Sequence, residues 1–274
     1  MSELGKRVIT AFILLGFAIG WMFFLNDVWF DRVTALIGLM MSVELLVMVG
    51  MRRTFLYALA AAFSWALLLV FWTVLPAAVG LLAAILFCML IWTLLFFVNS
   101  EEHLLSDDFK NLAYAQWLMT LLLIFVWSVM VLHRQEGGVW FLSGALIGVW
   151  SADIAAYFTG RALGMNKLCP AVSPGKTREG FYGALVFGSL GASLTWIWML
   201  GMEPLQAVLL SLVLVLVSVG GDLAESALKR AVGVKDSGNI LPGHGGILDR
   251  TDALLPSIPV VGLIWMGLAW MGQV

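Results

Sequence analysis

The chain has 274 residues, of which 62% are hydrophobic and only 12% charged, and its formal net charge is −2. A soluble domain of this size would not carry so little charge together with 13 Trp and 14 Met, so the composition excludes a soluble globular protein. The small net charge indicates no particular charged partner, and we predict no nucleic-acid partner. The chain is predicted to be an all-α, polytopic integral membrane protein with the lipid bilayer as its surroundings.

Apolar runs of about 20 residues, the length that crosses a hydrocarbon core of roughly 30 Å, recur along the whole chain. Nine transmembrane helices are predicted, near residues 7–26, 29–50, 56–74, 76–98, 111–133, 138–160, 180–200, 204–228 and 253–272. The third and fourth runs are divided only at Leu75-Pro76, and joining them as one kinked element would leave eight. The first run lacks a small-residue cleavage site, which favours an uncleaved anchor over a signal peptide.

Basic residues are retained on the cytoplasmic side of a membrane, so the lysines and arginines test the number of spans. With nine spans and a cytoplasmic N-terminus, every Lys and Arg except Arg32 and Arg134 falls on the cytoplasmic side. Eight spans would divide the basic loops between the two sides. The charge distribution therefore favours nine spans with the N-terminus in the cytoplasm.

The two halves of the chain differ in where their polar residues lie. Residues 1–137 are predicted to form about five spans, and their one longer connection, residues 99–110, is interpreted as a solvated acidic linker. From residue 138 onward, ionisable residues enter the spans and the cytoplasmic loops lengthen, at residues 161–179 and 229–252. We predict an N-terminal transmembrane region at 1–137 and a C-terminal catalytic region at 138–274.

The sixth span carries an acid close to its cytoplasmic end. Asp153 and Tyr157 lie four residues apart and therefore share one face of a helix. An acid about two turns inside the membrane costs on the order of 3 kcal/mol on insertion scales, so Asp153 is expected to face a wet cavity or a cationic partner. The alternative is an ion pair that joins two helices.

The loop before the seventh span reads Ser173-Pro-Gly-Lys176-Thr177-Arg178-Glu-Gly. Glycine frees the backbone, while the basic side chains and the hydroxyls of Ser173 and Thr177 suit the oxygens of a phosphate. The similarity to a Walker A loop is superficial, because the upstream glycine spacing is absent. A loop that only retains positive charge on the cytoplasmic side is the alternative.

The eighth span is expected to continue as a helix through Arg230. One polar stripe would then run along it, made of Asp222, Glu225, Ser226 and Lys229. Gly220 and Gly221, just before the stripe, permit a close approach of another backbone. The opposite face of this helix is expected to stay apolar.

After Gly233 the chain enters a glycine-rich segment that ends at Ile247-Leu-Asp249-Arg250-Thr-Asp252. Asp222 and Asp249, on separate elements, could converge on a hard divalent cation, which prefers oxygen ligands. The nearby basic residues that could neutralise a polyphosphate are Lys229, Arg230, Lys235 and Arg250. His244 could be a ligand, a phosphate hydrogen-bonder or a turn residue. This pattern indicates metal-assisted phosphoryl or nucleotidyl transfer.

The C-terminal half resembles one enzyme family, the phosphatidate cytidylyltransferases or CDP-diacylglycerol synthases. Its signature is matched by Ser226-Ala-Leu-Lys229-Arg230, Lys235-Asp236-Ser-Gly and Leu241-Pro-Gly-His244-Gly-Gly-Ile-Leu-Asp249-Arg250-Thr-Asp252. The segments at Asp153 to Tyr157, Ser173 to Thr177 and Gly221 to Ser226 are also similar to that family. The resemblance covers roughly residues 138–274, whereas the N-terminal half matches only as a string of spans.

The resemblance implies that CTP and phosphatidic acid react to give CDP-diacylglycerol and diphosphate, a step of phospholipid biosynthesis in the cytoplasmic (inner) membrane, with the active site facing the cytosol. It implies Mg²⁺, with K⁺ as a candidate second ion, and Asp222 and Asp249 as the metal ligands. The residues expected to be catalytic are Asp222, Lys229, Asp249 and Arg250. Those expected to bind substrate are Ser173, Lys176, Thr177, Ser226, Arg230, Lys235, Asp236 and His244. Supporting roles are expected for Asp153, Glu225 and Asp252.

Two other functions remain open from the sequence. Another CTP-using lipid enzyme, such as a polyprenol kinase, would transfer the γ-phosphate and release CDP. A cation-coupled transporter would also bury acids, but it would be expected to line a path from both sides with polar residues. Oligomeric state also stays open, because the small residues of the later spans would allow a homodimer.

Overall fold

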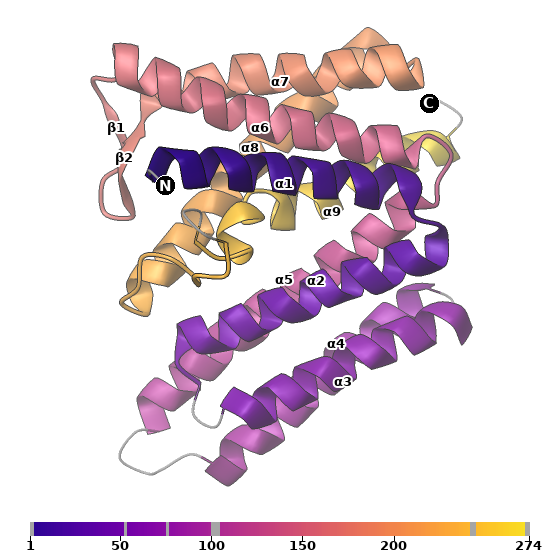
Figure 1. Cartoon of the computed structure of the whole chain (residues 1–274), viewed down its shortest axis with the longest axis vertical. Coiled ribbons are helices and arrows are strands. Elements are labelled where there is room, and N and C mark those ends of the chain that lie inside the picture. The colour runs from indigo at the N-terminus through magenta and orange to yellow at the C-terminus, as the bar shows by residue number, and fades with distance from the viewer. Residues whose placement is uncertain (1–2, 52–53, 75–76, 100–104, 242–244, 272–274) are drawn as a thin grey trace. The chain divides into compact units, whose positions relative to one another are not determined.

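The computed structural model describes residues 3–51, 54–74, 77–99, 105–241 and 245–271 (Figure 1). Most of these residues are helical. The helices are α1 (Glu3–Phe24), α2 (Asp27–Val49), α3 (Thr54–Val74), α4 (Ala77–Asn99), α5 (Leu105–His133), α6 (Gly138–Leu163), α7 (Arg178–Leu200), α8 (Pro204–Ala231) and α9 (Leu254–Trp270). A short 3-10 helix, η2 (Leu248–Arg250), precedes α9.

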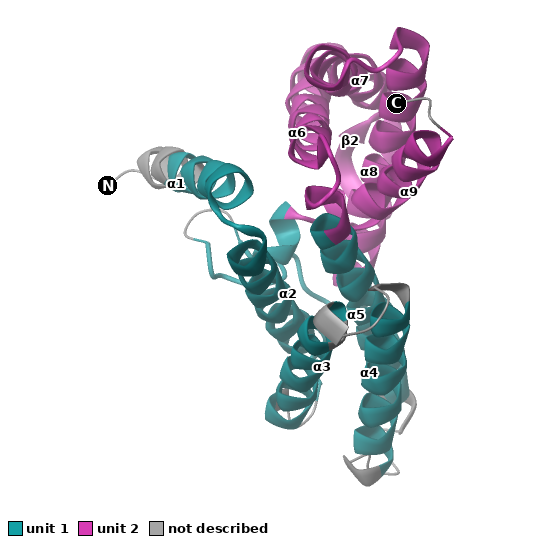
Figure 2. Cartoon of the chain, turned by 90° about the vertical axis from the view of Figure 1, so that its right-hand side faces the viewer, with its two compact units in different colours: residues 1–130, 231–250 teal, residues 131–230, 251–274 magenta. Residues whose placement is uncertain are grey.

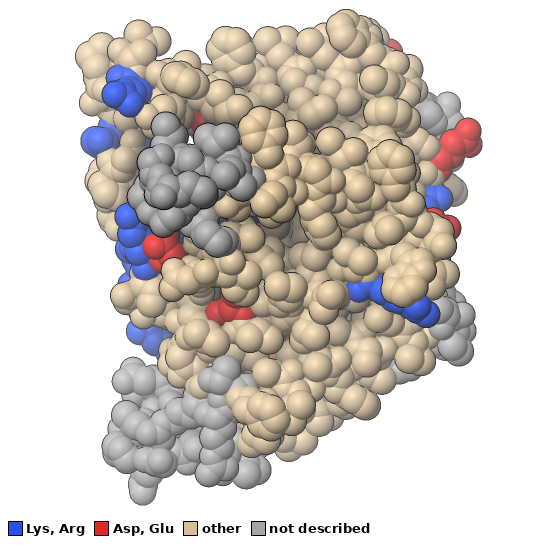
Figure 3. All heavy atoms as spheres, in the orientation of Figure 1, with Lys and Arg blue, Asp and Glu red and all other residues tan. Residues whose placement is uncertain are grey.

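The helices confirm an all-α membrane protein. Six of those described are long and apolar enough to cross a bilayer, and shorter apolar stretches lie at Phe12–Phe24, Phe55–Val70 and Leu254–Trp270. Leu75-Pro76, the predicted point of division, lies outside the described residues, but α3 and α4 are separate helices on either side of it. Large apolar side chains are exposed, and the surface seen in Figure 3 is mostly uncharged, as expected where lipid replaces water.

The predicted loop at residues 161–179 contains a small β-hairpin, which the sequence analysis did not anticipate. Strand β1 (Lys167–Cys169) pairs antiparallel with β2 (Ser173–Thr177), with Lys167 opposite Thr177. The backbone N–H of Arg178 also donates to the carbonyl of Asn166, at 2.8 Å. The segment expected to be an open phosphate loop is therefore a strand that leads directly into α7.

The chain forms two compact units (Figure 2). Residues 1–130 and 231–250 make up the first, and residues 131–230 and 251–274 the second. The glycine-rich segment after α8 thus packs with the N-terminal helices. The predicted division into regions at 1–137 and 138–274 stays a prediction.

A polar contact at the centre of the first unit joins three of its helices. The indole N–H of Trp65 in α3 donates to the hydroxyl of Ser42 in α2, at 3.0 Å. That hydroxyl lies 3.3 Å from the sulfur of Met119 in α5. Gly38 makes room for the indole, since a Cβ there would come within 2.6 Å of the Trp65 ring. These contacts hold the middle of α2 in a close-packed core.

In the second unit, α6 and α7 pack along a seam of small residues. A Cβ on Gly148 would lie 2.7 Å from the Cβ of Ala192, and one on Gly188 would lie 2.7 Å from the Cβ of Ala152. Toward the other end of the seam, a Cβ on Gly180 would lie 3.4 Å from the Cα of Gly160. Small residues let the two backbones approach closely, as is usual in membrane helix packing. The seam fixes the start of α7, and with it the hairpin, beside the end of α6.

Candidate active site

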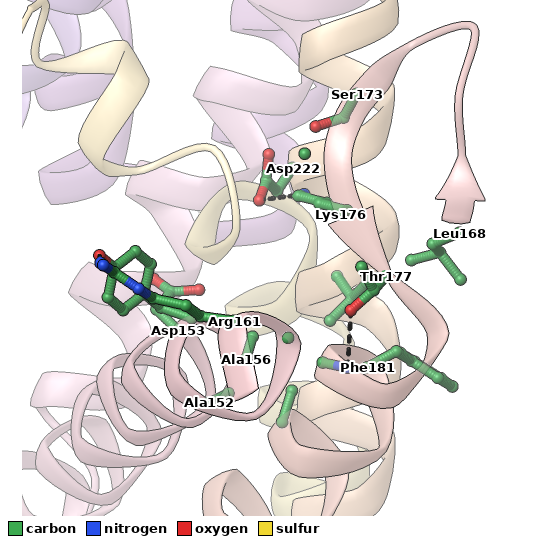
Figure 4. Close-up of a pocket in the computed structure, with 16 residues that line it drawn as sticks. Ala152, Asp153, Ala156, Arg161, Leu168, Ser173, Lys176, Thr177, Phe181 and Asp222 are labelled. Carbon is green, nitrogen blue, oxygen red and sulfur yellow. Dashed lines mark hydrogen bonds and ion pairs between the residues drawn. The ribbon is translucent and has the colours of Figure 1, made fainter. Parts of the chain in front are cut away.

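A cavity of about 540 Å³ lies in the second unit, bounded by α6, the hairpin, the first turns of α7 and the middle of α8 (Figure 4). Its walls include small apolar side chains of α6 and α7. Its polar side chains are Asp153, Tyr157, Arg161, Ser173, Lys176, Thr177 and Asp222. The structure therefore brings together the end of α6 that carries Asp153, the Ser173–Thr177 segment, and Asp222 of the polar stripe on α8.

The ammonium group of Lys176 in β2 forms an ion pair with the carboxylate of Asp222 in α8 (Figure 4). Both side chains are partly open to solvent, at 28% and 29% exposure. The hydroxyl of Ser226, one turn further along α8, donates to the other oxygen of Asp222 at 3.3 Å. The expected helix through Arg230 is confirmed, and Asp222 is oriented by one basic group and one hydroxyl.

The other predicted residues of the hairpin differ in what they do. Thr177 is buried, and its hydroxyl accepts the backbone N–H of Gly180 at 3.1 Å, which caps the N-terminus of α7. Ser173 lines the cavity from the start of β2. An added Cβ at Gly175 would have no neighbour within 4 Å, and its backbone is not left-handed. The conformation seen here therefore does not require glycine. Thr177 is therefore a structural cap at the cavity wall.

The helix face predicted for Asp153 and Tyr157 is confirmed, because both line the cavity. One turn later, Arg161 donates from Nη1 to the hydroxyl of Tyr157 at 2.8 Å. The sequence analysis did not include Arg161 among the site residues, although its spacing of four from Tyr157 was a usable signal. Arg161 gives the cavity a second basic side chain beside Lys176.

Further along α8, Glu225 and Lys229 are buried, whereas Arg230 is exposed. The ammonium group of Lys229 lies 3.4 Å from Oε1 of Glu225, and both side chains are buried, at 9% and 3% exposure. Arg230 is exposed at the end of the helix. Neither Lys229 nor Arg230 is among the residues that line the cavity, so their predicted role toward phosphates stays a prediction.

Gly221 brings α8 against the turn before α9. A Cβ at this position would lie 2.8 Å from the carbonyl oxygen of Asp252, so the close approach expected of Gly221 is confirmed. The same expectation is wrong for Gly220, where an added Cβ would have nothing within 4 Å. Burial, and then the charge of nearby Asp222, raise the pKa of Asp252 to about 6. Two acids thus face each other at this point.

Replacing Asp252 with asparagine should stabilise the metal-free protein at pH 8. Because the folded state binds the Asp252 proton more tightly than the unfolded state, the wild type loses stability as the pH rises from about 4 through 6. Asparagine removes this loss of stability. It also keeps an oxygen that can accept the Ala253 N–H, which in the wild type lies 2.8 Å from Oδ1 of Asp252. Thermal unfolding in detergent with EDTA should show a higher Tm for Asp252→Asn at pH 8 and little difference at pH 4. An equal difference at both pH values would contradict the assignment.

The glycine-rich segment belongs to the first unit and is held by acidic side chains. Asp249 accepts the backbone N–H of Ser237, at 2.9 Å from Oδ2, and that of Gly246, also at 2.9 Å. Gly233 and Gly245 have φ values of 78° and 83°, as expected for turns that favour glycine. The exposed residues of the segment include Lys235, Asp236 and Arg250. His244 lies outside the described residues.

Glu44 of α2, which the sequence analysis did not single out, contacts the glycine-rich segment. It is buried, at 4% exposure, and its carboxylate accepts the backbone N–H groups of Ile247 and Leu248. The available signal was an acid within an apolar span, which is a functional indication by default.

A metal site stays a prediction. Asp222 belongs to the second unit and Asp249 to the first. Within the described parts of the chain, no three His, Cys, Asp or Glu side chains gather as a ready-made metal site. The donor chemistry nevertheless fits Mg²⁺, which is usually held by one or two carboxylates together with substrate phosphates. A cation beside Asp222 would also offset the repulsion that raises the pKa of Asp252.

Comparison with known proteins gives one consistent result. The profile of the cytidylyltransferase family matches residues 5–266. A phosphatidate cytidylyltransferase of Pseudomonas aeruginosa is 37% identical over 275 residues, covering 97% of this chain and 98% of that protein. One of Brucella suis is 36% identical, covering 96% and 93%. One of Bacillus subtilis is 43% identical over 138 residues, covering 49% and 51%.

Proposed function

Because the chain belongs to the cytidylyltransferase family, we propose that it transfers the cytidylyl group of CTP to phosphatidic acid, the reaction named for its relatives. A phosphate oxygen of phosphatidic acid attacks the α-phosphorus of CTP. The bond from that phosphorus to the bridging oxygen of the β-phosphate breaks, and diphosphate leaves while CDP-diacylglycerol forms. The match of family and relatives over nearly the whole chain carries this proposal.

The cavity of the second unit suits two highly charged substrates. The nucleophile is already anionic near neutral pH, so the protein needs to position the reacting groups and offset their repulsion more than it needs a strong base. Lys176 and Arg161 supply positive charge at the cavity wall. Lys176 is paired with Asp222, and its ammonium group could pass from this carboxylate to an entering phosphate. We assign Lys176 and Arg161 to phosphate binding.

Magnesium would be held by Asp222 and Asp249 together with phosphate oxygens of CTP. When bound, it would stabilise the negative charge that develops on the leaving diphosphate. Asp222 would orient toward it with the help of Ser226, whose hydroxyl already contacts the carboxylate. Potassium as a second ion and a homodimer stay proposals that rest on the resemblance and on the small-residue helix faces.

The enzyme would work in the cytoplasmic (inner) membrane with its cavity open to the cytosol. Support comes from the positive-inside distribution, since the hairpin and the end of α8 carry lysines and arginines at the side predicted to be cytoplasmic. CTP would then enter from water, and phosphatidic acid from the surrounding lipid.

The reaction is tested by adding CTP, phosphatidic acid and Mg²⁺ to purified protein in detergent, with ATP and EDTA controls. Lipid-dependent diphosphate release that requires CTP is the expected result. Lipid-dependent CDP formation without diphosphate would indicate a kinase instead. No turnover with any lipid or metal would contradict the proposed reaction and favour the alternative of a cation-coupled transporter.

A further inference from the structure

The acid Glu44 lies in the last third of the apolar helix α2 (Asp27–Val49), far from the cavity residues in the sequence. Its side chain is 4% exposed, although α2 is otherwise one of the helices apolar enough to cross a bilayer. A buried carboxylate is tolerated only where hydrogen bonds replace water. The hydrogen-bond partners of Glu44 therefore indicate why an acid is kept at this position.

Both oxygens of Glu44 accept hydrogen bonds from consecutive backbone amides of the glycine-rich segment. Oε1 accepts from Ile247 at 3.0 Å, and Oε2 accepts from Leu248 at 2.9 Å. Hydrogen bonds to a carboxylate are stronger than those between neutral groups. A pair of them on adjacent amides fixes both the position and the direction of the backbone.

Two glycines of the same segment make room for this carboxylate. A Cβ on Gly246 would lie 2.8 Å from both Glu44 oxygens, and one on Gly238 would lie 2.9 Å from Oε1. The glycines thus serve the close approach of Glu44 rather than flexibility alone. The contact therefore depends on the Glu44 carboxylate and also on the absence of side chains at Gly238 and Gly246.

The anchored amides lead directly to Asp249. Leu248 begins the short helix η2, and Asp249 is its second residue. The carboxylate of Asp249 in turn accepts the N–H groups of Ser237 and Gly246, at 2.9 Å each from Oδ2. Moving the Ile247 and Leu248 amides would therefore move the Asp249 carboxylate.

We infer that Glu44 is a positioning residue of the active site, which acts by holding the backbone before Asp249. This inference rests on the proposed function in so far as Asp249 serves the reaction. It assigns a role in the chemistry to a helix in the N-terminal half of the chain.

Glu44→Gln tests the inference, because glutamine keeps the size of the side chain but replaces one acceptor oxygen with an NH₂ group that faces a donor. Ser42→Ala is the matched control, since Ser42 is buried on the same helix and its hydroxyl contacts Gly38, Trp65 and Met119 instead. Hydrogen–deuterium exchange of the full-length protein should be faster for residues 245–250 in Glu44→Gln and unchanged in the control.

Activity provides the second readout. Loss of an outer partner of a metal-binding group typically costs 10–100-fold in activity or metal affinity. We expect Glu44→Gln to raise the Mg²⁺ concentration for half-maximal diphosphate release by about 10-fold or more, with the KM for phosphatidic acid within about twofold of wild type. Faster exchange with an unchanged Mg²⁺ response would reduce Glu44 to a tether for folding and overturn the inference. Unchanged exchange would overturn it as well.

A second variant keeps the test decisive if Glu44→Gln does not fold. Gly238→Ala disturbs the same contact from the other side, because the three atoms nearest to its added Cβ all belong to Glu44. Gly267→Ala is its control, because nothing lies within 4 Å of the Cβ added there. Gly238→Ala should give the same faster exchange and raised Mg²⁺ requirement. A wild type without turnover would refute the proposed function, whereas the exchange measurements would still show whether Glu44 holds the segment.

Discussion

Replacing Asp222 with asparagine is expected to lower turnover by about 10²–10³-fold, the size of effect seen when a group that stabilises transition-state charge is removed. The substitution removes a negative charge that pairs with Lys176 and that we assign to the metal. The shape of the side chain is kept, and Ser226 can still donate to its remaining oxygen. The loss should appear as a fall in diphosphate release at saturating CTP, lipid and Mg²⁺.

Folding should survive this change. Lys176 and Asp222 are both more than a quarter exposed, so water can solvate the ammonium group that loses its partner. Elution as a single species and an unchanged circular dichroism spectrum would show that the variant is folded. Glu136→Gln, at an exposed acid between α5 and α6, is the control and should retain full activity. Magnesium-dependent turnover near the wild-type rate in Asp222→Asn would refute its role.

Much of the fold could be predicted because the bilayer restricts the possible structures. A chain in lipid must satisfy every backbone hydrogen bond internally, so apolar runs of sufficient length become helices. The predicted spans and the observed helices agree, and α3 and α4 are separate helices in the described part of the chain. The hairpin escaped prediction because strands of 3 and 5 residues show no periodic pattern.

The sequence could predict which residues belong to the candidate site, but it could not predict which of them contact one another. Lys176 and Asp222 were both selected from their local motifs, yet nothing in either motif shows that they pair across 46 residues. Thr177 was predicted to bind substrate, and its capping contact could not be foreseen, because a hydroxyl that caps a helix and one that binds phosphate occur in the same sequence context. Glu44 contacts a segment 203 residues away, and only the folded chain reveals such a contact.

Asp249→Asn is expected to have the other large effect, again a loss of turnover of about 10²–10³-fold. Its carboxylate has two functions. It carries the charge that we assign to the metal, and it accepts the N–H groups of Ser237 and Gly246. Asparagine offers one acceptor oxygen and turns an NH₂ group toward a backbone donor. Both the charge and the geometry of the segment should therefore be lost.

The comparison of Asp249→Asn with Glu44→Gln separates these two effects. Both variants should show faster hydrogen–deuterium exchange in residues 245–250, because each removes an acceptor from backbone amides of that segment. Only Glu44→Gln retains the Asp249 carboxylate, so only its activity should recover as Mg²⁺ is raised. Recovery of the activity of Asp249→Asn at high Mg²⁺ would mean that Asp249 holds the segment without binding the metal. The second metal ligand, besides Asp222, would then be another residue, and Asp252 is the first candidate.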